Sequence, residues 1–357
     1  RWKRRTGLRN LGNTCYMNSV LQSLASLDRF REFFVDELLP PAPPAASARA
    51  GAGPAFWRRA TLDCMLLATK TKPTGRDADE EASLCLQLHN ILRVLHSGKW
   101  AVVTPYAFLR ATWQNIDQFR NYQQQDAEEF LCLLMDCVRG ELEEGTFAEK
   151  VARPRGAAPP TSAALMLRTF RGTTVTTVTC SRCRNASRTS TPFLDLLLDV
   201  PPAFYHEARK GAASVSRRRR PPTCSLAECL DHYARPEELE GYRCDKCEAD
   251  VPARKGSLLA VTPNILCFVV KRFSWVNNAK IDTSIQLPVR LDMEPYMEAT
   301  AEGASSHYQL VSVVVHHGTS RTMGHYTSYG YNKNLDQWVH YNDSSVSVVG
   351  RQALDDL

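Results

Sequence analysis

The sequence predicts an α+β fold in which helices come first and strands follow. Apolar residues recur at helical spacing before Gly145, whereas short runs of β-branched and aromatic residues dominate after Phe170. This segregation is typical of α+β folds and not of doubly wound sheets. Because 43% of the 357 residues are hydrophobic, the chain can bury a sizeable core.

The helical part contains four predicted helices. One of them is expected to begin at Thr104-Pro105, where an N-cap residue precedes a proline at the first helical position. The helix over 82–96 is expected to stop at Gly98, since glycine commonly ends helices. The other three predicted helices are amphipathic and cover 15–27, 82–96 and 126–142.

The part of the chain after Phe170 contains the predicted strands. Low-complexity stretches interrupt the chain at three places. The expected strands are 173–179, 194–200, 265–270, 309–315, 325–331 and 338–341. Three stretches rich in Pro, Ala, Gly or Arg cannot offset the entropy of ordering, so flexible loops are expected at 39–54, 152–162 and 207–222. The last contains Arg217–Arg220, interpreted as a solvated loop, with a localisation signal as the alternative.

Composition limits the compartment and the partners. The 12 cysteines include two CxxC pairs and follow no signal peptide, which favours a reducing compartment. The net charge of +6 is compatible with an acidic partner such as chromatin, but it does not identify a nucleic-acid binder. No apolar run reaches 18 residues, so no membrane-spanning helix is predicted.

Cys15 is a candidate nucleophile. It is expected in the first turn of a helix, where the macrodipole and unpaired N–H groups favour the thiolate. Asn10 and nearby backbone N–H groups are candidate donors to a developing oxyanion. A buried structural cysteine is the alternative, and this segment alone does not decide between them.

His325 lies in a predicted β-hairpin that turns at 332–335. If the hairpin folds about the middle of that turn, Trp338 lies opposite Tyr329 and Asn342 lies opposite His325. A cross-strand neighbour would then hold the imidazole, and a slip of one residue would present the wrong face.

Either of two adjacent side chains could orient that imidazole. Asn342 would fix its tautomer, and Asp343 would also favour the imidazolium. A nucleophile, a base and a group that holds the base form a catalytic triad. A histidine satisfied within a strand pair is the alternative.

Two CxxC pairs predict one structural zinc ion. Four thiolates complete a tetrahedral site and leave no position for water, so the zinc is not expected to be catalytic. Redox pairs or plain buried thiols are the alternative. The predicted ligands are Cys180, Cys183, Cys244 and Cys247.

Together these segments resemble the ubiquitin-specific peptidases, papain-like cysteine proteases with a thumb, a palm and fingers. The resemblance covers nearly the whole chain in the family's order. It implies a short basic N-terminal segment at 1–6 and a catalytic domain at 7–357. Within that domain, the family would place a helical thumb at about 7–145, zinc-tipped β fingers at about 166–260 and a β-sheet palm mainly at 261–357. The matching segments are 7–18, 122–130, 192–196, 266–273, 324–327 and 341–344.

The resemblance implies roles for individual residues. Cys15 would be the nucleophile and His325 the general base, with no catalytic cofactor. Asn342 stands at the orienting position with Asp343 as the adjacent supporting acid, and Asn10 stands at the position of an oxyanion-hole side chain.

Two further residues, Gln124 and Asp126, stand where the family contacts the tail of ubiquitin, whose arginines suit an acid. Glu128 departs from the family's usual His or Gln. The chain begins just before the Cys box and ends before the family's final strand, so the resemblance implies a catalytic fragment.

The expected function is therefore a thiol-dependent deubiquitinase. Segments 97–101, 292–296 and 316–318 resemble the branch that acts on ubiquitinated histone H2B, which favours the nucleus over the cytoplasm. Ubiquitin and ubiquitinated proteins are the expected partners, with no membrane and no sequence-specific nucleic acid. The alternatives are a catalytically inactive ubiquitin-binding module of the same fold and a zinc-stabilised chromatin or nucleic-acid binder.

Overall fold

The computed structural model describes most of the chain as two compact units. The first unit comprises Arg1–Met166, Val311–Gly318 and Thr322–Gly350, and the second comprises Leu167–Leu310, Thr319–Arg321 and Arg351–Leu357. The three predicted loops, 39–54, 152–162 and 207–222, lie outside the described residues. None of the described helices is both long and apolar enough to cross a membrane. The described residues are 5–38, 83–143, 169–205, 223–274, 279–303, 306–318, 323–333 and 335–355.

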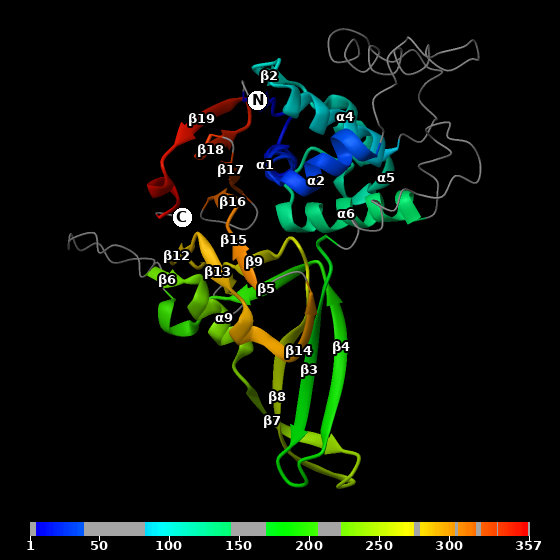
Figure 1. Cartoon of the computed structure of the whole chain (residues 1–357), viewed down its shortest axis with the longest axis vertical. Coiled ribbons are helices and arrows are strands. Elements are labelled where there is room, and N and C mark those ends of the chain that lie inside the picture. The colour runs from blue at the N-terminus through cyan, green and yellow to red at the C-terminus, as the bar shows by residue number, and fades with distance from the viewer. Residues whose placement is uncertain are drawn as a thin grey trace, which may run out of the picture. The chain divides into compact units, whose positions relative to one another are not determined.

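The first unit combines a group of helices with a four-stranded sheet, and its residues come from two distant parts of the sequence (Figure 1). Its elements are β1 (Gly7–Leu8), α1 (Cys15–Ala25), α2 (Asp28–Glu32), η1 (Phe33–Glu37), α4 (Leu84–Ser97), β2 (Val102–Val103), α5 (Tyr106–Asn115), η3 (Asp117–Phe119), α6 (Ala127–Glu143), β16 (Ser312–His317), β17 (His325–Asn332), β18 (Gln337–Asn342) and β19 (Ser345–Val349).

Helix α4 is closed at both ends by the residues that its sequence supplies. Ser83 is the N-cap, and its Oγ accepts the N–H of Leu86 at 3.0 Å. Gly98 ends the helix at φ 59, as predicted, because glycine adopts the left-handed conformation without penalty. The buried carboxylate of Glu141, on α6, accepts the N–H of Leu84 at 2.7 Å and the Ser83 hydroxyl. The negative charge of this carboxylate stabilises the N-terminal end of α4, where the helix dipole is positive.

Aromatic rings hold the helices of this unit together. Tyr16 of α1 stacks on Phe119 with ring centroids 5.6 Å apart, and it meets Phe130 of α6 edge-on at 5.3 Å. Phe130 also contacts Phe108 of α5. All four rings are buried, so the start of α1 is fixed against three other helical elements.

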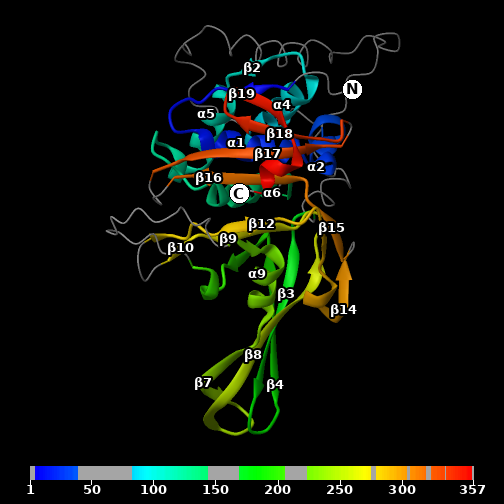
Figure 2. The same ribbon diagram turned by 90° about the vertical axis from the view of Figure 1, so that its left-hand side faces the viewer.

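The sheet of the first unit runs antiparallel in the order β16-β17-β18-β19, and α1 packs against β17 (Figure 2). Gly330 of β17 makes this approach possible, because a Cβ there would lie 2.2 Å from the Oγ of Ser26. A hydrogen bond of 2.6 Å between the hydroxyls of Ser23 and Ser312 adds a polar contact between helix and sheet. The helix that begins at Cys15 is thereby placed beside the strand that begins at His325.

The predicted register of the β17–β18 hairpin is wrong by two positions. Trp338 pairs with Tyr331 rather than with Tyr329. The turn is centred later because Asn332 accepts the N–H of Leu335 through both its carbonyl and its side-chain oxygen. A shift of two leaves every side chain on its predicted face, since the period of a strand is two residues.

The second unit is mostly β-structure. Its elements are β3 (Gly172–Cys180), β4 (Ala186–Phe193), β5 (Asp195–Asp199), η4 (Pro202–Phe204), β6 (Thr223–Ser225), α9 (Leu226–Ala234), β7 (Glu237–Cys244), β8 (Ala249–Thr262), β9 (Cys267–Lys271), β10 (Phe273–Ser274), β11 (Ala279–Lys280), β12 (Ser284–Gln286), β13 (Arg290–Asp292), η5 (Glu294–Tyr296), β14 (Met297–Gly303), β15 (His307–Gln309) and η6 (Arg351–Leu354).

Long antiparallel strands dominate this second unit (Figure 1). Strand β3 pairs with β4 on one side and with β8 on the other, and β8 also pairs with β7. Beside them, β5 and β9 run parallel, and Leu196 and Leu198 of β5 are buried at alternate positions. They pack with Leu230 of α9 in one apolar cluster.

The α+β class is confirmed, with local corrections. The N-cap of α5 is Pro105, so the prediction of Thr104 as the cap is wrong by one residue. The predicted strand 309–315 is divided into β15 and β16, which belong to different sheets. The helix predicted over 15–27 ends at Ala25 as α1, and α2 follows after a short break.

Candidate active site and four-cysteine centre

Cys15 occupies the first position of α1, as predicted. Thr14 precedes it as the N-cap, and the Cys15 side chain is only 6% exposed. Burial raises the pKa of the Cys15 thiol, whereas the backbone N–H groups of Tyr326, Tyr16 and Cys15 oppose that effect and nearby Asp343 adds to it. The N–H groups at the helix start lower the pKa of the Cys15 thiol, in the predicted direction, but desolvation by burial is the larger effect and the net pKa is raised.

The thiol faces the strand that carries His325. The hydrogen-bonding contact between the thiol and the N–H of Tyr326 places the sulfur next to the residue that follows His325. Two segments more than 300 positions apart are thus brought together, as the sequence predicted.

The imidazole of His325 is held by Asn342. Its Nε2 lies 2.7 Å from Oδ1 of Asn342. Because an amide oxygen can only accept, this contact assigns the proton to Nε2 and leaves the lone pair on Nδ1. Asn342 reaches this position although the two residues are not opposite each other in the ladder, since the pairing of β17 with β18 begins at Ser328.

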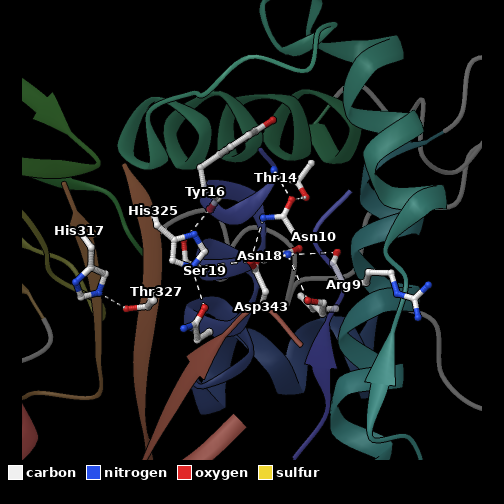
Figure 3. A network of polar contacts seen from close by, with 12 residues as sticks. Arg9, Asn10, Thr14, Tyr16, Asn18, Ser19, His317, His325, Thr327 and Asp343 are labelled. Atoms are coloured by element: carbon white, nitrogen blue, oxygen red, sulfur yellow. Dashed lines mark hydrogen bonds and ion pairs between the residues drawn. The ribbon is translucent and has the colours of Figure 1, made fainter. Parts of the chain in front are cut away.

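The partly buried Asp343 carboxylate joins several polar groups beside His325 (Figure 3). Its Oδ2 lies 3.9 Å from Nε2 of His325 and accepts the Asn10 side-chain amide at 3.0 Å. Its Oδ1 accepts the amide of Asn18 at 2.8 Å. Asp343 adopts φ 49, in the left-handed region, within the tight turn that joins β18 to β19.

Asn18 is the residue that the sequence analysis missed. It is 2% exposed and lies three positions after Cys15 on α1, so both side chains share a helix face. That spacing is the signal that could have identified it. By binding the carboxylate of Asp343, Asn18 links α1 directly to the turn that follows Asn342.

The side chain of Asn10 is fixed on both of its polar atoms. Its Oδ1 accepts the backbone N–H of Gly12 at 3.0 Å and of Thr14 at 3.2 Å. One N–H of its amide nitrogen points to Asp343, as described above, which leaves a second N–H on the same atom. Gly12 adopts φ 102, a conformation that favours glycine, so the loop can fold back tightly before Cys15.

The predicted substrate-binding residues lie in the same unit and are exposed. The Oε1 of Gln124 accepts the N–H of Gly324 at 2.8 Å, one residue before His325. Asp126 stands immediately before α6, and its carboxylate accepts the N–H groups of Glu128 at 2.8 Å and Glu129 at 3.3 Å. Asp126 is thus the N-cap of α6, in addition to its predicted role.

The arrangement combines the groups that acyl transfer needs. A sulfur nucleophile lies beside a strand that presents an oriented imidazole, and the imidazole is tied to an amide oxygen. The backbone N–H groups of Tyr326, Tyr16 and Cys15 lie close to the sulfur. These groups are capable of thiol-based hydrolysis of an amide bond.

The four predicted metal ligands meet in the second unit. Cys180 and Cys247 have sulfurs 3.9 Å apart, and Cys183 and Cys244 have sulfurs 3.6 Å apart. All four sulfurs lie within 4.8 Å of one another. Tetrahedral zinc with Zn–S bonds of 2.3 Å separates its sulfurs by roughly 3.8 Å. The cluster could therefore hold a zinc ion, whereas a disulfide needs its sulfurs at about 2 Å.

Both CxxC turns have the same backbone geometry. The N–H of Arg184 donates to the carbonyl of Cys180, and the N–H of Glu248 donates to that of Cys244. Arg184 at φ 61 and Glu248 at φ 51 both adopt the left-handed conformation. The N–H of Cys183 also points to the sulfur of Cys180 at 3.4 Å and lowers the pKa of that thiol. Each turn is thus shaped to present two thiolates to one ion.

The comparisons with known proteins agree with this arrangement. The chain is 36% identical over 396 residues to ubiquitin carboxyl-terminal hydrolase 44 of Danio rerio, covering 96% of this chain and 53% of that protein. It is 32% identical over 367 residues to ubiquitin carboxyl-terminal hydrolase 3 of Homo sapiens, covering 98% of this chain and 65% of that protein. The chain thus spans about half to two thirds of the length of these relatives.

A solved structure has the same fold. The SAGA DUB module, with Ubp8, Sgf11, Sus1 and Sgf73 bound to monoubiquitin, matches with a TM-score of 0.66 and 22% identity, covering 98% of this chain and 66% of that chain. The family model described as "Ubiquitin carboxyl-terminal hydrolase" matches residues 6–356, nearly the whole sequence. The chain that carries Cys15, His325 and the four-cysteine cluster therefore belongs to the ubiquitin carboxyl-terminal hydrolase family.

Proposed function

We propose that this chain is a thiol-dependent deubiquitinase that hydrolyses the isopeptide bond after the C-terminal glycine of ubiquitin. The observation that carries the proposal is the hydrogen bond of 2.7 Å between His325 and Asn342, on a strand whose next residue contacts the sulfur of Cys15. Membership of the family and the names of the relatives support the same reaction.

In the first half of the reaction, Cys15 attacks the carbonyl carbon of the terminal glycine. Nδ1 of His325 takes the thiol proton as the C–S bond forms, because Asn342 holds the other proton on Nε2. This transfer matters because burial favours the neutral thiol in the resting site. The oxyanion is stabilised by N–H donors that include the second amide proton of Asn10, and such a donor contributes about 3 kcal/mol.

In the second half, the imidazolium of His325 protonates the lysine amine, which leaves as the C–N bond breaks. The product is a thioester between Cys15 and ubiquitin. His325 then removes a proton from water, which attacks the thioester carbonyl. The C–S bond breaks, ubiquitin leaves with a free carboxylate, and His325 returns the proton to the sulfur of Cys15. The carboxylate of Asp343 lies 3.9 Å from Nε2, so a negative charge stands beside the imidazolium that forms in both halves.

The four-cysteine cluster is proposed to hold one structural zinc ion. The ligands would be Cys180, Cys183, Cys244 and Cys247, whose spacing fits tetrahedral coordination. Bound there, zinc would join the ends of β3 and β7 to the two turns and would supply no catalytic water. The exposed strands around the cluster, such as β4, are proposed to contact the body of ubiquitin.

Ubiquitinated histone is the proposed substrate class, and the nucleus is the proposed compartment. Both follow from the resemblance of segments 97–101, 292–296 and 316–318 to the histone-directed branch. Cleavage of ubiquitinated nucleosomes, compared with free diubiquitins of defined linkage, tests this choice. Nucleosomes that are cleaved no faster than the diubiquitins would contradict it.

The proposed activity is tested with a ubiquitin–fluorophore conjugate. Cys15→Ala is expected to abolish turnover and to retain ubiquitin binding, because alanine keeps the fold and removes the sulfur. A normal rate in this variant would refute the assignment of the nucleophile. Ubiquitin with a C-terminal electrophile should label the wild type covalently at Cys15. Binding without labelling would instead identify a catalytically inactive ubiquitin-binding module.

A further inference from the structure

The first residues of β17 pair with a neighbouring strand on one side only. On one side, pairing with β16 extends to His317 opposite His325. On the other side, pairing with β18 begins only at Ser328. The segment that carries His325 is therefore held by a strand along one edge only. This gap gives the sulfur of Cys15 access to the N–H of Tyr326.

The residue before His325 is held by Gln124. Oε1 of Gln124 accepts the N–H of Gly324 at 2.8 Å, across 200 positions of sequence. Gly324 also presses against β16, because a Cβ there would lie 2.0 Å from Nε2 of His316 and 2.7 Å from the carbonyl oxygen of His317. The backbone at Gly324 is thus fixed from two directions.

The residue after His325 is held by the same segment that contains Gln124. The hydroxyl of Tyr326 lies within hydrogen-bonding reach of the carboxylate of Asp126 and of the N–H of Ala127. The segment 124–127 therefore contacts both neighbours of His325.

We propose that Gln124 is a positioning residue for His325, and that its side-chain carbonyl fixes the first residues of β17 so that the imidazole stays aligned with the sulfur of Cys15. The role of His325 as the base in this statement rests on the proposed function. Displacement of reacting groups by about 1 Å can cost 10²-fold in rate. Loss of the bond to Gly324 is therefore expected to act mainly on kcat.

Two substitutions separate this role from simple substrate contact. Gln124→Met keeps the length of the side chain and removes the acceptor for the N–H of Gly324. Gln124→Glu keeps an oxygen at that position and should keep the hydrogen bond. Gln118→Met makes the same chemical change at an exposed residue of η3 and serves as the control.

The experiment measures kcat and KM with a ubiquitin–fluorophore conjugate, together with the pH dependence of Cys15 alkylation by iodoacetamide without ubiquitin. Gln124→Met is expected to lower kcat by about 10-fold or more and to shift the alkylation profile. Gln124→Glu should lose clearly less kcat than Gln124→Met, since the acceptor for the N–H of Gly324 is retained. The Gln118→Met control should match the wild type in both measurements.

The proposal is overturned if Gln124→Met raises KM alone and leaves kcat and the alkylation profile unchanged. It is also overturned if Gln124→Glu loses as much kcat as Gln124→Met. A wild-type chain that does not hydrolyse the conjugate would contradict the proposed function instead. In that case the alkylation profiles still decide whether Gln124 aligns His325 with Cys15, because they need no ubiquitin.

Discussion

Acid is expected to destabilise the first unit through one buried histidine. His89 of α4 is 2% exposed, and its Nδ1–H donates to the carbonyl of Phe34 in η1. Burial lowers the pKa of His89 from 6.5 to about 4, nearby Arg93 adds to this effect, and the contact with Phe34 opposes it. The folded protein therefore keeps His89 neutral under mildly acidic conditions.

The size of the effect follows from the two pKa values. Below pH 6.5 the unfolded chain binds a proton that the folded chain does not accept until the pH approaches 4. The unfolded state holds more protons in this window, so the free energy of unfolding falls as the pH falls. The expected loss is about 2 kcal/mol between pH 7.5 and pH 5, and about 3 kcal/mol once the pH is below 4.

Urea unfolding of the wild type and of His89→Gln, each at pH 7.5 and pH 5.0, measures this loss. Glutamine does not titrate, and its amide can still donate to the carbonyl of Phe34. The wild type is expected to lose about 2 kcal/mol more than the variant, because contributions from all other groups cancel. An equal loss in both proteins would refute the argument that burial keeps His89 neutral.

Three further predictions concern the triad, the cap of α4 and the metal. Asn342→Ala should lower kcat about 10²-fold, since the imidazole loses its tautomeric restraint, and an unchanged kcat on a ubiquitin–fluorophore conjugate would exclude that role. Glu141→Gln should cost about 2 kcal/mol in urea unfolding, because charged hydrogen bonds to Leu84 and Ser83 weaken. The matched exposed change Glu143→Gln should cost less than about 1 kcal/mol, and equal costs would contradict the capping argument. Cys247→Ser should remove the bound zinc in metal analysis, and a variant that retains one ion per chain would rule out the proposed ligand set.

Local signals in the sequence were sufficient for the elements whose stability is mostly local. Helix α4 ends at Gly98 as predicted, because a left-handed glycine acts within one turn, whereas it begins at Leu84, two residues after the predicted start, where Ser83 is the N-cap. Strand β4 was not predicted, since Ala186–Phe193 is polar and almost fully exposed. It is a strand because it pairs along its length with β3, which is a tertiary contact.

The candidate site shows the same division between local and tertiary information. The motifs around Cys15 and His325 predicted the nucleophile and the base, and a resemblance to one family predicted the supporting residues around them. The raised pKa of Cys15 could not be predicted, because it depends on how much surrounding structure covers the sulfur. The roles of Asn18 and of the Gln124 carbonyl were also hidden, since their partners lie hundreds of positions away.

The division of the first unit between two distant stretches of sequence has a consequence for synthesis on the ribosome. Asn10 and Asp343 are 333 positions apart, and most of the second unit, including Leu167–Leu310, is encoded between them. Translation at 5–20 residues per second takes roughly 17–67 s to cover that interval. The second unit can begin to fold during this time, whereas the helices must wait for β16–β19. The nascent chain therefore cannot bring Cys15 and His325 together until the stretch that forms β16–β19 has emerged from the ribosome.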